Sequence, residues 1–247
     1  MKNKINNKKI IYSKFTKYGE YIYHTSYSPL KLLGGLPLRG NNTNNDRSER
    51  TQEENEKLQE IYSKNSKRKL KALILCNLPY GNTKFLTLTY RTPQFNETKA
   101  KNDFKNFIKR LKYHTKIQIR YIAVHEKHES YSTQTERVNS YHFHVLISNL
   151  NYVSSQIYAD IWQHGFIKIN KVKGEPMRMA NYVAKYLTKS NTHNKYQRRF
   201  LYSKNCFRPY DIPISEVPVL EFMHSRVYNR FTGGIARCDI YKIHNNS

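Results

Sequence analysis

The stretch from Tyr141 to Ser148, YHFHVLIS, alternates histidine with apolar residues over its first half. This pattern predicts a β-strand, in which successive side chains point to opposite faces. His142 and His144 then share one face, about 6.5 to 7 Å apart along the strand. The opposite face is apolar and carries Tyr141, Phe143, Val145 and Ile147. Such a strand requires sheet partners and a core on its apolar side, so it constrains the fold more than any other stretch.

The two imidazoles have two interpretations. They can hold a divalent metal ion if a third ligand arrives from a neighbouring strand. They can also be two polar residues on a solvated strand face, and taken alone this interpretation is favoured, because His-x-His is short and the chain has 10 His.

The charge balance indicates the kind of partner. The net charge is +25, from 43 Lys and Arg against 18 Asp and Glu, and an acidic polymer would neutralise it. Nucleic acid is therefore the expected partner, with an anionic membrane surface as the alternative. No run of about 18 apolar residues is present, so we expect no membrane span and a soluble intracellular protein. The three cysteines are far apart, which indicates neither a disulfide framework nor a thiolate zinc site.

The chain is expected to have four parts. Residues 1–45 form a basic N-terminal segment, with a strand or hairpin arm at 21–28. Residues 46–83 form a basic amphipathic helix, capped by Asp46 or Ser48, that is solvated, lies on a DNA backbone, or does both. A catalytic domain spans 84–190. Residues 191–247 form a C-terminal extension of loops and short pieces, with a hairpin bending at Gly233–Gly234, and we assign it no chemistry.

From residue 84 onward the pattern predicts the order β-α-β-β-α-β-α. Strands are expected at 85–91, 117–126, 141–148 and 166–172. Helices are expected after Asn96, at 153–163 with Gly165 ending it, and at 177–190. The helix after Asn96 has the clearest apolar stripe, namely Ala100, Phe104, Phe107, Ile108 and Leu111.

Glu126 is the expected third metal ligand. It ends the strand that precedes the histidine strand, and neighbours joined by a loop are most simply antiparallel. The carboxylate would lie beside the imidazoles only in the right register, which the sequence does not determine. His125 and His128 are rivals, ranked lower because His125 has the wrong face parity and His128 lies in the loop. Two imidazoles and a carboxylate with open positions suit Mg²⁺ or Mn²⁺ holding a phosphate oxygen.

The stretch MRMANYVAKYLTKS, residues 177–190, places two phenols on one helix face. Tyr182 and Tyr186 lie one turn apart, at the boundary between an apolar flank and a flank carrying Lys185 and Lys189. This is a suitable position for a nucleophile facing a phosphodiester, and a nearby ammonium would favour the phenolate. Amphipathic aromatics that only flank the core are the alternative, since the chain has 21 Tyr.

HFHVLIS and YVAKYLTK, with FLTLTY upstream, resemble the three motifs of HUH-superfamily rolling-circle replication initiators. The resemblance is closest to the two-tyrosine type of small single-stranded DNA phages and related plasmids, and covers roughly residues 84–190. It implies an α+β fold in which helices pack on a central antiparallel sheet of about five strands, with basic extensions at both ends. The histidine pair would lie on a central strand, with the tyrosine helix in front of the metal.

The same resemblance implies roles for single residues. His142, His144 and Glu126 would hold Mg²⁺ or Mn²⁺, Tyr182 and Tyr186 would be nucleophiles, and Lys185 would be the lysine of the tyrosine motif. The implied activity is nicking and rejoining of single-stranded origin DNA through a 5′-phosphotyrosine, in the bacterial cytoplasm, with a host helicase and DNA polymerase as partners.

Three alternatives remain open at this point. A transposase or relaxase of the same superfamily would use the same metal chemistry, although the paired tyrosines favour an initiator. A non-catalytic single-stranded nucleic-acid-binding protein would use aromatic rings to stack bases. A structural basic protein, such as a coat or packaging factor, would have no use for both the histidine pair and the tyrosine pair.

Overall fold

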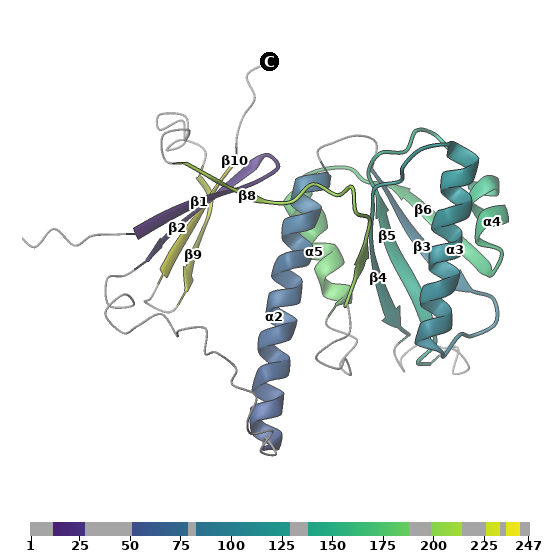
Figure 1. Cartoon of the computed structure of the whole chain (residues 1–247), viewed down its shortest axis with the longest axis horizontal. Helices are drawn as coiled ribbons and strands as arrows, with labels where there is room; N and C mark the ends of the chain where they lie inside the picture. The colour runs from purple at the N-terminus through teal and green to yellow at the C-terminus, as the bar shows by residue number, and fades with distance from the viewer. Residues whose placement is uncertain are drawn as a thin grey trace, which may run out of the picture. The chain divides into compact units, whose positions relative to one another are not determined.

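The computed structural model describes residues 12–27, 51–78, 83–128, 138–187, 199–213, 226–232 and 236–242. The chain forms two compact units (Figure 1). One unit combines residues 1–51 with residues 209–247, and the other comprises residues 52–208.

The first unit contains a five-stranded antiparallel sheet in the order β8-β1-β2-β10-β9. Its strands are β1 (Tyr12–Tyr18), β2 (Tyr21–Tyr27), β8 (Tyr210–Ile212), β9 (Arg226–Thr232) and β10 (Ala236–Lys242). The strand expected at 21–28 is confirmed as β2. The hairpin expected near the C-terminus is confirmed by the pairing of β9 with β10, while its predicted bend at Gly233–Gly234 lies outside the described residues.

The second unit contains the sheet that carries the histidine strand. Its strand order is β6-β3-β5-β4-β7, and every pairing is antiparallel. The strands are β3 (Lys84–Tyr90), β4 (Tyr121–Lys127), β5 (Tyr141–Ile147), β6 (Gly165–Lys171) and β7 (Leu201–Tyr202). The predicted α+β class and the five-stranded sheet are confirmed, and β5 lies at the centre. The fifth strand, β7, lies beyond residue 190.

Four helices of the described residues pack on this sheet, and the predicted order of elements from residue 84 is confirmed. They are α2 (Gln52–Asn77), α3 (Glu97–Thr115), α4 (Ser155–Trp162) and α5 (Pro176–Tyr186). Asn96 caps α3 as expected, since its side chain accepts a hydrogen bond from the Lys99 N–H at 3.0 Å. No described helix has the length and apolar character needed to cross a membrane.

Three predicted helix boundaries were wrong. Helix α2 begins at Gln52 rather than near residue 46, and the proposed caps Asp46 and Ser48 lie outside the described residues. Helix α4 ends with Gln163 in the left-handed conformation, not at Gly165, which opens β6. A Cβ at Gly165 would clash with the backbone of β3, so close strand contact explains this glycine. Helix α5 ends at Tyr186, before residue 190.

One face of the second sheet builds the main core beneath α3 and α4 (Figure 1). Phe143 of β5 stacks on Phe104 of α3 with ring centroids 4.9 Å apart. All five residues of the predicted α3 stripe are buried, as are the four apolar residues predicted to share one face of β5. The alternating pattern of β5 and the helical pattern of α3 in the sequence therefore predicted this buried face correctly.

The other face of the sheet is covered as well, by α2 and α5 (Figure 1). Ile74 of α2 and Leu78, which follows the end of that helix, line a small cavity together with Ile122 of β4 and Leu146 of β5. Every residue of β5 is buried. The alternative of a solvated strand face for the histidine pair is therefore wrong, because helices pack on both sides of the sheet.

Candidate metal and tyrosine site

The register between β4 and β5 places Glu126 directly opposite His142, and Val124 opposite His144. The pairing continues past the end of β4, where the His128 N–H donates to the Ser140 carbonyl at 2.9 Å. The Asn139 N–H in turn donates to the His128 carbonyl at 3.0 Å. This extension of the ladder holds the end of β4 against the start of β5. It fixes the register between the two strands, which the sequence left undetermined.

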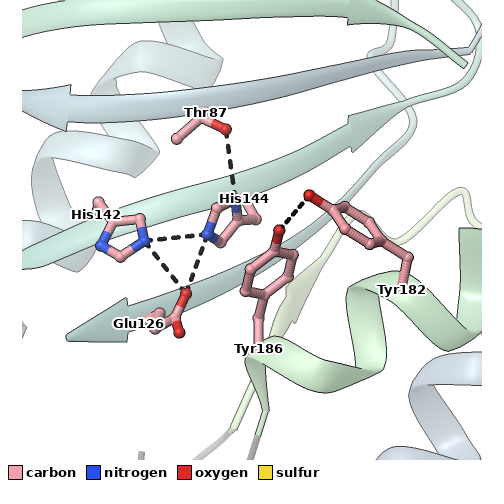
Figure 2. A network of polar contacts seen from close by, with 6 residues as sticks. All are labelled: Thr87, Glu126, His142, His144, Tyr182 and Tyr186. Atoms are coloured by element: carbon pink, nitrogen blue, oxygen red, sulfur yellow. Dashed lines mark hydrogen bonds and ion pairs between the residues drawn. The ribbon is translucent and has the colours of Figure 1, made fainter. Parts of the chain in front are cut away.

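Glu126, His142 and His144 bring three ligand atoms together (Figure 2). The two Nε2 atoms are 3.0 Å apart, and Glu126 Oε2 lies 3.2 Å from His142 Nε2 and 3.0 Å from His144 Nε2. Each of these residues is more than nine-tenths buried. Within the described ranges, they form a group of side chains able to hold a metal ion.

The Glu126 carboxyl is ionised despite its burial. Desolvation opposes ionisation, but hydrogen bonds from His142 and His144 outweigh it and lower the Glu126 pKa to about 2. The group therefore offers an anionic oxygen and two imidazole nitrogens to a common point.

This donor set fits a divalent cation. Metal–ligand bonds of about 2.1 Å at right angles place neighbouring ligand atoms about 3.0 Å apart, as in one face of an octahedron. The three separations of 3.0 to 3.2 Å match that spacing. Mixed imidazole and carboxylate ligands suit divalent transition ions, and a single carboxylate also suits Mg²⁺.

Two residues of β3 support His144, and neither is among the site residues predicted from the sequence. Thr87 lies opposite His144 in the register, with its Oγ1 3.4 Å from His144 Nδ1. The Phe85 ring is parallel to the His144 ring, with centroids 5.7 Å apart. Alternation along FLTLTY puts both residues on one face of the strand, but only the register of β3 with β5 brings that face to the site.

The two rival ligands lie in different places. His125 is on the opposite face, where its Nε2 lies 3.0 Å from Glu97 of α3, as its parity predicted. His128 is on the metal side, and its ring stacks on that of His142 with centroids 4.2 Å apart. His128 follows the last residue of β4, as predicted, and it does not belong to the group of three ligand atoms, although backbone hydrogen bonds to Ser140 and Asn139 hold it beside β5.

Tyr182 and Tyr186 reach the site from α5 (Figure 2). The Tyr186 ring stacks on the His144 ring with centroids 3.7 Å apart, and its hydroxyl donates to the Tyr182 hydroxyl at 2.5 Å. Burial raises the pKa of Tyr186 well above its ordinary value, and the hydrogen bond to Tyr182 and the Glu126 charge add to this shift. Tyr182 is 43% exposed and meets the Phe85 ring edge-on.

Helix α5 has a buried side that holds the phenols in place. Ala180, Val183 and Ala184 are buried, and Leu187 follows as the C-cap. Pro176 begins the helix, where its missing N–H costs nothing. Lys185 is exposed in the last turn, and Lys189 lies outside the described residues. The structure thus brings together five of the six predicted site residues and leaves Lys185 on the outer side of the same turn.

Comparisons with known proteins give one family match and one similar structure. No curated protein matches the sequence. A similar solved structure is the hypothetical protein ORF119 from Sulfolobus islandicus rod-shaped virus 1, which shares 17% sequence identity over 53% of this chain and 97% of its own, with a TM-score of 0.35. Residues 83–191, which run from the start of β3 past the end of α5, match the family described as Replication-associated protein ORF2. That family match supports a replication-initiator-like protein.

Proposed function

We propose that this protein is a replication initiator that nicks single-stranded origin DNA through a tyrosine, in a domain spanning residues 84–190. The observation that carries the proposal is the buried group Glu126, His142 and His144 with the Tyr182 and Tyr186 phenols packed beside it. The match of residues 83–191 to a replication-associated family supports it from the sequence side.

The proposed reaction is transfer of a phosphodiester to a phenol. A tyrosine oxygen attacks phosphorus, and the bond from phosphorus to the 3′ oxygen breaks. The phenol loses its proton, and the departing 3′ oxygen gains one to become a free 3′-OH. The 5′ side of the DNA remains on the enzyme as a 5′-phosphotyrosine. Because the phosphodiester energy is kept in the covalent bond, the reaction needs no ATP.

Glu126, His142 and His144 would hold Mg²⁺ or Mn²⁺, which supplies positive charge to a non-bridging oxygen of the scissile phosphate. Tyr182 and Tyr186 present their hydroxyls together on the side of His144. Lys185, exposed in the last turn of α5, adds a positive charge near the incoming DNA. The free 3′-OH would then prime a host DNA polymerase, working with a host helicase.

A second tyrosine allows termination by the same chemistry. After one round of synthesis, the second phenol can cleave the regenerated site. The 3′-OH released by that cleavage then attacks the first phosphotyrosine, which reseals the DNA and frees the first tyrosine. The pair, with hydroxyls 2.5 Å apart, supports this exchange within one site.

The test uses the full-length protein and 5′-labelled and 3′-labelled single-stranded oligonucleotides from the replicon that encodes it. With Mn²⁺ or Mg²⁺ we expect a covalent adduct that carries only the 3′-terminal label, because the 5′ phosphate of that fragment is bound to tyrosine. The adduct should disappear with EDTA and in the variant Tyr182→Phe/Tyr186→Phe.

Two outcomes would contradict the proposal in different ways. Binding of the oligonucleotide without any adduct would favour a non-catalytic single-stranded nucleic-acid-binding protein. An adduct that persists in the double phenylalanine variant would show that another residue is the nucleophile.

A further inference from the structure

We propose that His128 is a positioning residue for His142. Its ring packs against that imidazole and keeps His142 Nε2 directed at Glu126 and His144. The inference rests on the proposed function, because it concerns the same metal centre, and it adds a ring contact that the three-ligand group does not include.

The backbone determines where the His128 ring lies. His128 is two residues after Glu126 and is paired by backbone hydrogen bonds with Ser140 and Asn139, so it continues β4 on the face of Glu126. From that position its ring reaches across to the next strand. The centroids of the His128 and His142 rings are 4.2 Å apart and their planes differ by 28°, which is a stacked contact.

The two metal-side imidazoles are supported differently. The Nδ1 atom of His144 has Thr87 Oγ1 at 3.4 Å, and its ring lies against the ring of Tyr186. His142 Nδ1 is buried and, within the described part of the chain, has no hydrogen-bond partner. Metal-binding histidines usually donate their second ring N–H to a group that fixes the ring orientation. Because no described residue gives His142 Nδ1 such a hydrogen bond, the stacked His128 ring is the contact that supports this side of the imidazole.

Removing the His128 ring would open space beside His142 and let its imidazole turn. Nε2 would then leave its position 3.2 Å from Glu126 Oε2 and 3.0 Å from His144 Nε2. Phenylalanine would keep the stacked ring but has no nitrogen, which separates packing from direct ligation. Leucine would keep most of the volume without a flat ring.

The experiment compares Mn²⁺ affinity of full-length wild type, His128→Ala, His128→Leu and His128→Phe, from the loss of the free Mn²⁺ EPR signal. We expect about tenfold or greater weakening for Ala and Leu, as for other groups that orient a ligand. His128→Phe should stay within about threefold of wild type, since an aromatic ring restores the stacking. Melting temperatures measured without metal identify any variant that does not fold. If His128→Ala does not fold, His128→Leu takes its place in the comparison.

A coupled variant tests whether His128 acts through His142. In the His142→Ala background, His128→Ala should cause no further loss of affinity, because the ring it positions is absent. Unchanged affinity in folded His128→Ala or His128→Leu would overturn the inference and leave the proposed function standing. Equal loss in His128→Phe and His128→Ala would also overturn it, and would make the His128 nitrogen a ligand. A wild type that binds no Mn²⁺ would contradict both the inference and the proposed metal centre.

Discussion

The Tyr186 hydroxyl donates a hydrogen bond to the Tyr182 hydroxyl oxygen, so the two phenols are not equivalent. Tyr186 packs on His144, whereas Tyr182 is 43% exposed and accepts the hydrogen bond. A phenolate forming at Tyr182 would keep that bond, and the exposed ring is open to DNA. The two tyrosines therefore have different surroundings, and we expect them to have different roles in the reaction, which their spacing in the sequence does not reveal.

We therefore predict that Tyr182 makes the first cleavage. Tyr182→Phe should lower the rate of first adduct formation by roughly 10³-fold or more, as expected when a nucleophile is removed. Tyr186→Phe should lower it only about tenfold, the cost of one hydrogen bond to a charged oxygen. Single-turnover adduct formation on one origin oligonucleotide measures both rates, and a larger loss in Tyr186→Phe would reverse the assignment.

Metal binding should stabilise the folded protein. At a Mn²⁺ concentration 100 times the Kd, the free energy of unfolding should rise by about 2.7 kcal/mol, because the ion binds only the folded site. Glu126→Gln removes the anionic ligand and should lose most of this gain. Glu97→Gln, in α3, is the control: Glu97 contacts His125 on the face of β4 away from the metal group, so this variant should keep the gain. Thermal unfolding with Mn²⁺ and with EDTA gives the difference, and a full shift in Glu126→Gln would exclude Glu126 as a ligand.

Helix α2 should contact the DNA backbone through those lysine and arginine side chains that pair with no carboxylate among the described residues. Lys57 and Lys64 pair with Glu53 and Glu60, whereas Lys67 and Arg68 make no ion pair with a carboxylate among the described residues. Helix α2 also lies beside the tyrosine helix α5 (Figure 1).

Lys67→Gln/Arg68→Gln should therefore weaken binding to single-stranded DNA and reduce the salt slope of log K by about 1.4, for two lost phosphate contacts. The matched variant Lys57→Gln/Lys64→Gln should change the slope less. Fluorescence anisotropy with a labelled oligonucleotide at several salt concentrations measures both slopes. Slopes equal to that of wild type in both variants would identify α2 as a solvated helix.

Glu97 should make the free energy of unfolding depend on pH in the acid range. Its hydrogen bond with His125 is the main reason that its pKa falls from 4.5 to about 2, and Lys101 also contributes. Because the folded pKa is the lower one, this stabilisation is complete above pH 4.5 and is lost as the pH falls towards 2.

Glu97→Gln should accordingly reduce the free energy of unfolding by about 1.5 kcal/mol at pH 7, the size of a charge-assisted hydrogen bond. The difference from wild type should shrink towards zero near pH 2. Urea unfolding of both proteins across this pH range tests the prediction, and a difference that does not change with pH would show that the lowered pKa of Glu97 does not contribute.

Local periodicity explains which parts of this protein can be predicted from sequence. Alternation in a strand is a backbone property, so the shared face of His142 and His144 and the apolar face beneath α3 follow from the sequence. Helical spacing likewise places Tyr182 and Tyr186 on one face of α5. Boundaries were less accurate, as at Gln163 and Tyr186, because capping and tertiary contacts end a helix earlier than its apolar pattern does.

By itself, the sequence determined the order of elements after residue 84, the faces on which the histidines and tyrosines lie, and the excess of positive charge. Only the tertiary structure decided that Glu126 stands opposite His142, that His128 stacks on His142, and that residues from both ends of the chain share one sheet. The reason is that strand register, ring stacking and long-range pairing depend on contacts between residues far apart in the chain. Periodicity constrains a side chain only relative to its own backbone.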